Sequence, residues 1–291
     1  MLKIHNEFVG GNISVKEICG DTVFLENELR DTKGDWFYWA FCVEGAQGRE
    51  LTFSFQPTRL GYWGPAVSHD LKNWHWLGQV DDESFTYRFG EDESTVYFAH
   101  HILYHPDRLL TFAKEVGLPV STLCQSRKGR DVPCIRFGEG SRSMILTARH
   151  HACESTGNYV LEGVLESLAA EPLADTRVLC VPFVDYDGVV DGDQGKSRQP
   201  HDHNRDYTSD AASIYPEVAA IRAQADTYGC HLGFDFHSPW HKGGGNDTIF
   251  VVRNSVEKLD RFELFADFLA EAITPDSMQY EKANDYPPMT G

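Results

Sequence analysis

The chain has 291 residues, which is enough for two domains or one large one. Hydrophobic residues make up 41% of it and aromatic residues 12%, which is ample for packed cores. The formal net charge of -18 argues against a nucleic acid or an anionic membrane as partner, because both require concentrated Lys and Arg. An acidic substrate is still compatible with this charge, since a local basic pocket can lie within an acidic surface.

The cysteines and the N-terminus predict a cytoplasmic protein. The seven cysteines are an odd number and form no CxxC pair, so free thiols in a reducing compartment are the simpler interpretation. Residues 1–5 lack the apolar core of a signal peptide, and no stretch is apolar enough to span a membrane. The sequence makes no prediction of the oligomeric state.

Residues 11–101 have the pattern of β structure. Short alternating or aromatic runs are separated by turn residues, a spacing typical of an antiparallel sandwich. The aromatic run from Trp36 to Phe41 could form a carbohydrate platform, but core packing is the commoner role of such residues. We therefore predict a β-sandwich domain over residues 1–110.

After Pro106 the signals of strands and helices alternate. Such alternation predicts an α/β domain with a mixed, mainly parallel sheet that helices cover on both faces. We place the boundary near 105–118 and expect this second domain over 111–291. The expected helices are 107–116, one starting near 155, 217–228 and 254–273; the expected strands are 144–148, 177–184, 232–236 and 249–252.

Two of these strands end next to residues that bind metals. The strand 144–148 delivers His151 and Glu154 to its end, and His237 follows the strand 232–236. An HxxE pair alone is usually part of a polar loop. Two imidazoles and a carboxylate, however, match the ligands of a catalytic zinc ion and leave a position open for water. We therefore predict one zinc ion bound by these three residues.

The long loop 191–207 is rich in specific polar groups. Asn204 and Arg205 could hold a carboxylate, because a guanidinium grips it with two hydrogen bonds and an amide adds a donor. Lys196 or Arg198 could polarise a carbonyl oxygen and stabilise the oxyanion that forms when water attacks. The alternative interpretation is a solvated, charged connector.

The remaining polar residues near the proposed site are expected to support it. Asp235 shares a face of its strand with His237 and could orient that ligand. The other histidines are expected to support the ligands or to face solvent rather than to bind a second metal; they are His150, His201, His203 and His241.

Three motifs in order resemble the zinc carboxypeptidases of the M14 type, in particular the cytosolic carboxypeptidase subfamily and its bacterial relatives. The motifs are Ala148-Arg149-x-His151-x-x-Glu154, Val181-Pro182-x-x-Asp185-x-Asp187-Gly188-Val189 and Asp202-His203-Asn204-Arg205, followed by His237-Ser238. Members of the subfamily also carry a β-sandwich before the catalytic domain. The resemblance extends over essentially the whole chain.

This resemblance implies roles for the residues that match the motifs. His151, Glu154 and His237 would bind zinc, and Asn204 with Arg205 would grip the C-terminal carboxylate of the substrate. An arginine would polarise the scissile carbonyl. Spacing does not choose between Lys196 and Arg198, and we prefer Arg198 for its fixed charge and fork geometry.

One departure concerns the general base. Family members use a glutamate on a late strand, with a tyrosine from a mobile loop nearby, and both lie well beyond the third zinc ligand. Glu263 and Glu271 fall in a helix pattern and Glu281 in a turn-like tail, so we assign the role to none of them. We expect a catalytic domain without its last strand and helix, which binds zinc and substrate but hydrolyses slowly.

These observations lead to three functional hypotheses. The first is a zinc metallocarboxypeptidase that acts on the C-terminus of a peptide or protein, cleaving a peptide or isopeptide bond. Subfamily resemblance makes acidic C-terminal residues the expected substrate. The second is an amidohydrolase acting on small N-acyl amino acids, and the third is a zinc-containing module that binds peptide C-termini without turnover.

Overall fold

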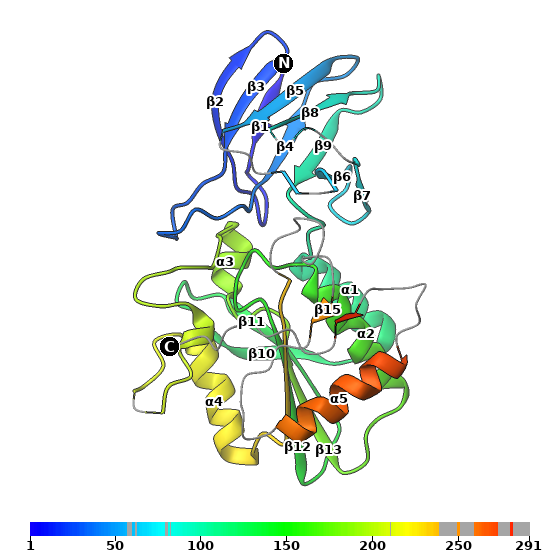
Figure 1. Ribbon diagram of the computed structural model, residues 1–291, viewed down its shortest axis with the longest axis vertical. Helices are drawn as coiled ribbons and strands as arrows, with labels where there is room; N and C mark the ends of the chain where they lie inside the picture. Colours follow the sequence, from blue (N-terminus) through cyan, green and yellow to red (C-terminus); the bar gives the residue numbers. More distant parts are fainter. Residues whose placement is uncertain are drawn as a thin grey trace. The chain divides into compact units, whose positions relative to one another are not determined.

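The fold is described from a computed structural model (Figure 1). The structure describes residues 1–56, 60–61, 63–78, 81, 83–209, 211–238, 249–250, 259–272 and 280–281. Residues Met1–Pro239 form one compact unit and Trp240–Gly291 a second. No described helix is both long and apolar enough to cross a membrane.

The first part of Met1–Pro239 consists of two β-sheets. One has the strand order β1-β4-β9-β6-β7 and the other β2-β3-β5-β8. Their bounds are β1 Lys3–His5, β2 Ser14–Cys19, β3 Thr22–Glu26, β4 Ala40–Glu44, β5 Glu50–Phe55, β6 Ala66–Ser68, β7 Trp74–Trp76, β8 Ser84–Arg88 and β9 Thr95–Ala99. The pairings are antiparallel except that of β3 with β5, which is parallel.

Aromatic side chains fill the space between these two sheets. Alternate residues of β5 are buried, as expected for a strand with one face on a core. Trp39 and Phe41 from one sheet pack with Phe53 and Phe85 from the other in a single buried cluster. The prediction that the aromatic run packs into a core is confirmed for the four aromatic residues that follow Trp36, all of which are buried. Trp36 itself is only half-buried.

The second part of Met1–Pro239 is built on a five-stranded mixed sheet of order β10-β11-β13-β12-β14. The strands are β10 Val120–Gln125, β11 Asp131–Phe137, β12 Arg142–Ala148, β13 Thr176–Val181 and β14 Leu232–Phe236. The central strand β12 pairs in parallel with both β13 and β14, whereas β11 is antiparallel to both of its neighbours. The predicted α/β fold class is confirmed, with parallel pairing concentrated where the site lies.

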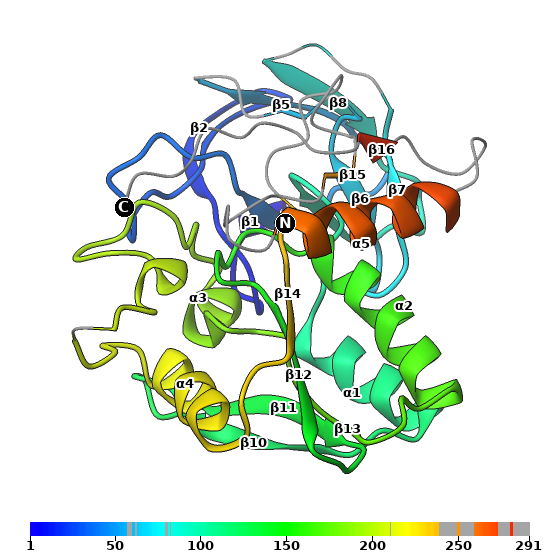
Figure 2. The ribbon, with the colours of Figure 1, turned by 60° about the horizontal axis from the view of Figure 1, so that its bottom comes forward.

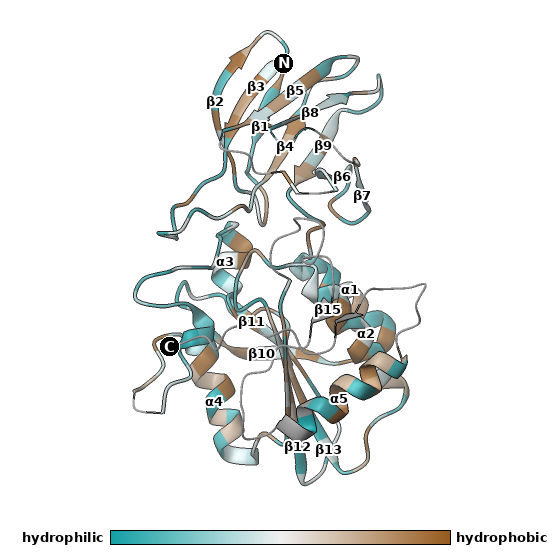
Figure 3. Cartoon of the chain, in the orientation of Figure 1, coloured by the Kyte–Doolittle hydropathy of each residue, from teal (hydrophilic) through white to brown (hydrophobic). Residues whose placement is uncertain are grey.

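Helices cover both faces of this sheet (Figure 2). α1 Pro106–Val116 and α2 Gly157–Ala170 pack against one set of alternate strand residues, which includes Leu146 and Cys180. α4 Pro216–Tyr228 packs against the other set, which includes Ile145 and Leu179. The central strands β12 and β13 are therefore buried on both faces, which is why they are continuous hydrophobic runs in the sequence (Figure 3).

One short α-helix of this unit was not predicted from the sequence. α3 Tyr186–Asp191 follows β13 closely, in residues to which the sequence assigned no element, except that Asp191 is the first residue of the expected loop 191–207. Asp185 caps its first turn by accepting a hydrogen bond from the backbone N–H of Gly188. The helix ends at Gly192, whose φ of +76° favours glycine and where an added Cβ would lie 2.2 Å from the carbonyl oxygen of Gly11.

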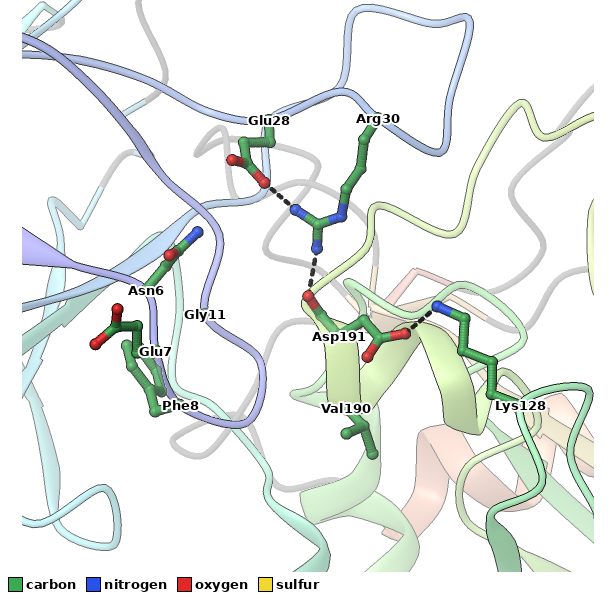
Figure 4. Close-up of a pocket in the computed structure, with 9 residues that line it drawn as sticks. All are labelled: Asn6, Glu7, Phe8, Gly11, Glu28, Arg30, Lys128, Val190 and Asp191. Atoms are coloured by element: carbon green, nitrogen blue, oxygen red, sulfur yellow. Dashed lines mark hydrogen bonds and ion pairs between the residues drawn. The ribbon is translucent and has the colours of Figure 1, made fainter.

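Polar contacts join the sandwich to the α/β part within Met1–Pro239. Arg30 pairs with Asp193 at 3.0 Å. Arg30 also contacts Glu28 and the carbonyl oxygen of Asp191, as Figure 4 shows. An open hollow of about 530 Å³ lies here, lined by residues of both parts, most of them polar. It contains none of the site residues singled out in the sequence.

The described residues of Trp240–Gly291 form a helix and a short strand pair. α5 is Leu259–Ala272, and β15 Ile249–Phe250 pairs in parallel with β16 Tyr280–Glu281. Glu263 and Glu271 lie on α5 and are exposed, as expected. Glu281 belongs to β16 rather than to an irregular tail, and residues 251–258 of the expected strand and helix lie outside the described part of the chain.

Glu217 leads to a prediction about stability. It lies on α4 with 2% of its surface exposed, and burial raises its pKa from 4.5 to about 7. Between these values the folded chain binds more protons than the unfolded chain, so the free energy of unfolding falls as pH rises through this window. We expect Glu217→Gln to raise the free energy of unfolding by about 2–3 kcal/mol at about pH 8 and to change it little at about pH 4.

Urea unfolding at both pH values measures this difference. The matched control is Glu139→Gln, because Glu139 is an exposed glutamate. Equal effects of the two substitutions at the higher pH would contradict the argument from burial.

Candidate active site

Three side chains meet at the carboxyl ends of β12 and β14. Because these strands are parallel neighbours, with Ala148 opposite Phe236, the segments that follow them lie side by side. Nδ1 of His151 lies 3.0 Å from one oxygen of Glu154, and Nδ1 of His237 lies 2.7 Å from the other. All three ligand atoms lie within 4.8 Å of one another. We call His151, Glu154 and His237 the metal cradle.

Each imidazole of the metal cradle has a second carboxylate near its Nε2 atom, on the side of the ring away from Glu154. Nε2 of His151 lies 3.7 Å from Asp202, and Nε2 of His237 lies 2.6 Å from Asp235. These contacts leave both Nδ1 atoms facing Glu154, an arrangement common for histidines that bind metals. Burial lowers the pKa of His237, but Asp235 and then Glu154 outweigh it and raise this pKa to about 10. The surroundings therefore favour positive charge, and the donor set fits a divalent cation.

His150 extends this support on the β14 side. The second oxygen of Asp235 lies 2.8 Å from Nδ1 of His150 and accepts a hydrogen bond from Thr147. Nε2 of His150 lies 2.8 Å from the hydroxyl of Tyr207. A second possible metal group, composed of His150, Asp235 and His237, shares a ligand with the metal cradle. Its contacts are those of a hydrogen-bonded support, as the sequence led us to expect.

The other singled-out histidines have separate partners. His201 lies 2.8 Å from Asp206. His203 is buried and stacks on Tyr215, with ring centroids 3.6 Å apart, and burial lowers its pKa to about 4. His241 lies outside the described residues.

Asn204 and Arg205 belong to a short 3-10 helix, His203–Arg205. Residues at both ends of this turn contact the cradle region, since Asp202 reaches His151 and Tyr207 reaches His150. The side-chain oxygen of Asn204 is buried and has no hydrogen-bond partner among the described residues. Such a turn can present an amide and a guanidinium to a ligand at the cradle.

Lys196 and Arg198 have different surroundings. The ammonium of Lys196 lies 2.7 Å from Glu154, so it is in direct contact with the metal cradle. Burial lowers the pKa of Lys196, but attraction by Glu154 outweighs it, and the net shift is upward. The guanidinium of Arg198 instead pairs through its three nitrogens with three carboxylates, at 2.8 to 2.9 Å; they are Asp31, Asp185 and Asp193.

Two contributors come from positions to which the sequence analysis gave no role at this site. Asp31 and Trp36 belong to the connection between β3 and β4, yet they contact the loop that carries Lys196. Their separation of about 160 residues from that loop leaves no local signal. Asp202 was visible only as the first residue of the motif that contains Asn204 and Arg205.

Comparison with known proteins finds relatives of the whole chain, although no family model matches it. An uncharacterized protein of Zymomonas mobilis, ZMO1242, is 30% identical, over 98% of this chain and 81% of its own length. Cytosolic carboxypeptidase 2 of Macaca fascicularis is 25% identical over 69% of this chain, which spans only 27% of that relative. A metallo-carboxypeptidase of Pseudomonas aeruginosa has the same fold, with a TM-score of 0.78 and 22% identity, over 98% of this chain and 82% of its own.

The contact between Asp235 and His237 leads to a prediction about metal affinity. Asp235→Asn removes the charge that orients His237, so the affinity for a divalent metal is expected to fall about 10–100-fold. Asp226→Asn on the exposed surface of α4 is the matched control and should leave the affinity unchanged. Competitive titration with a metal-binding dye measures both. Equal affinities of the two variants would show that Asp235 does not support the metal cradle.

Proposed function

This chain belongs to the M14-type family of metallocarboxypeptidases, which are hydrolases, and we propose that it is a zinc-dependent carboxypeptidase. It would hydrolyse the C-terminal peptide or isopeptide bond of a peptide or protein in the cytoplasm. The observation that carries the proposal is the convergence of two histidine Nδ1 atoms on the buried Glu154, each ring held by a carboxylate from behind.

The metal cradle suits zinc, with His151, Glu154 and His237 as its ligands. Two imidazoles and one carboxylate are a common donor set of catalytic zinc sites. Zinc bound there would lower the pKa of a water molecule and polarise the substrate carbonyl. The chain's part is to hold the ligands in place, through Asp202 behind one imidazole and Asp235 behind the other.

We assign the polarisation of the scissile carbonyl to Lys196. Its ammonium lies at the cradle, where a charge-assisted donor can stabilise a developing oxyanion. The contacts support Lys196 over Arg198, which the sequence favoured for its fork geometry. All three guanidinium nitrogens of Arg198 already face carboxylates, so Arg198 would hold the loop rather than contact substrate.

Asn204 and Arg205 would bind the free C-terminal carboxylate. Their turn is tied to the cradle region at both ends, and an amide with a guanidinium suits a planar carboxylate. The preference for acidic C-terminal residues rests on the subfamily resemblance. The sequence offers Lys196, Arg198 and Lys242 as candidate counter-charges for an acidic side chain. Lys196 and Arg198 already pair with carboxylates, and Lys242 lies outside the described residues. Rates with peptides ending in Glu, Lys, Leu and Phe would test this preference, and equal rates would defeat it.

Metal analysis and product analysis test the function itself. We expect about one zinc per chain in protein purified without chelator. Hydrolysis of a peptide from its C-terminus should stop with chelator and return with zinc. Glu154→Gln should lose both zinc and activity, whereas Glu166→Gln, an exposed position on α2, should retain both.

Other outcomes of the same experiment would replace the proposal. Absence of zinc even after zinc addition would refute it. Release of acid from N-acyl amino acids, with peptides left intact, would favour the amidohydrolase. Zinc-dependent binding of peptides without any product would favour the binding module.

A further experiment tests the carboxylate role of Arg205. Arg205→Met should lower kcat/KM about 10–100-fold for a peptide with a free C-terminus, because a charge-assisted hydrogen bond contributes about 1.5–3 kcal/mol. Amidation of the peptide should cause a similar loss in the wild type and little further loss in the variant. Arg88→Met, at an exposed position on β8, is the control. Additive effects of amidation and Arg205→Met would contradict the assignment.

A further inference from the structure

A segment of the sandwich holds the loop that carries Lys196. Asp31 accepts hydrogen bonds from the backbone N–H groups of Gln194, at 2.9 Å, and Gly195, at 2.8 Å. The buried side chain of Gln194 in turn accepts from the backbone N–H of Tyr38 and donates to its carbonyl oxygen. The two residues that precede Lys196 are therefore fixed by the connection between β3 and β4.

Trp36, in the same connection, contacts Lys196 directly. The ammonium of Lys196 lies 4.8 Å from the centre of the indole ring. Two hydrogen bonds orient Trp36: its indole Nε1–H donates to the hydroxyl of Ser197 at 3.1 Å, and its backbone carbonyl oxygen accepts from the side chain of Asn27 at 2.7 Å. Only 12% of the Lys196 side chain is exposed. The ammonium is thus held between an aromatic face and the carboxylate of Glu154.

The backbone at Ser197 shows that this arrangement is imposed by its surroundings. Ser197 has a φ of +53°, which is uncommon for a residue other than glycine. Its carbonyl oxygen accepts from the backbone N–H of Lys33, and its hydroxyl accepts from Trp36. Contacts from the sandwich thus hold the loop in a conformation that turns Lys196 and Arg198 to different partners.

We propose that Trp36 is a positioning residue, which holds the ammonium of Lys196 beside the metal cradle through a cation–π contact. The inference rests on the proposed function, in which Lys196 polarises the substrate carbonyl. Glu154 alone is a poor anchor for this ammonium, because a metal ion bound by Glu154 would share its charge and repel Lys196. The indole face attracts the ammonium independently of that carboxylate.

Two substitutions at Trp36 separate positioning from packing. Trp36→Phe keeps an aromatic face and Trp36→Leu keeps only apolar bulk, while both lose the hydrogen bond to Ser197. We expect Trp36→Leu to lower kcat about 10–30-fold, which is about 1.4–2 kcal/mol, with KM changed less than about threefold. Trp36→Phe should keep most of kcat. Trp63→Leu, at an exposed tryptophan of the sandwich, is the control and should match the wild type.

A packing role would give a different pattern. The Phe and Leu variants would then lose activity equally and in parallel with their loss of stability, and that result would overturn the proposal. Zinc content is measured for each variant, so that loss of metal is not mistaken for loss of positioning.

Tryptophan fluorescence tests the contact without requiring activity. Lys196→Met should change the emission of the wild type, because the indole of Trp36 loses the charge beside it. The same substitution in a Trp36→Phe background should leave the emission unchanged. If the wild type hydrolyses no peptide, the proposed function fails while the emission still decides the contact. Identical emission of Lys196→Met and the wild type would overturn the positioning role.

Discussion

The buried carboxylate of Glu154 is the feature on which the candidate site depends. With 1% of its surface exposed, its charge has to be compensated by partners within the protein. The parallel pairing of β12 with β14 brings the imidazoles of His151 and His237 to its two oxygens, and Lys196 approaches from a third segment. Segments up to 83 residues apart therefore meet at one anion. A bound metal ion would also compensate the negative charge of Glu154, which is why the arrangement suits a metal ion.

Buried polar groups need partners, and this need also explains why the sandwich contributes residues to the site. The loop between α3 and the turn at Asn204 has no regular structure, so its buried polar groups need partners elsewhere. Asp31 supplies an acceptor for two consecutive backbone N–H groups, and Gln194, with 0% exposure, bonds to both backbone groups of Tyr38. Without the sandwich these groups would lack partners, and the position of Lys196 would be less well determined.

Much of the α/β fold could be read from the sequence because apolar periodicity is a local signal. α4 was predicted to within one residue and β14 at its observed bounds, and the order of strand ends brought His151, Glu154 and His237 together in advance. α3 was missed because a helix of six residues carries no period and is defined by its caps. The roles of Asp31 and Trp36 could not be predicted, since they depend on packing between distant segments.

Lys196 and Arg198 show that the backbone conformation, and not residue type alone, decides which cation lies beside the metal cradle. Residues two apart in an extended segment point to the same side, so sequence spacing alone does not choose between the two cations. The left-handed φ of Ser197 breaks this alternation, and the two side chains face different partners. The guanidinium fork, favoured in the sequence for its grip on oxygen pairs, is engaged by carboxylates, among them Asp31 and Asp185. The compact ammonium of Lys196 is therefore the cation left beside the metal cradle.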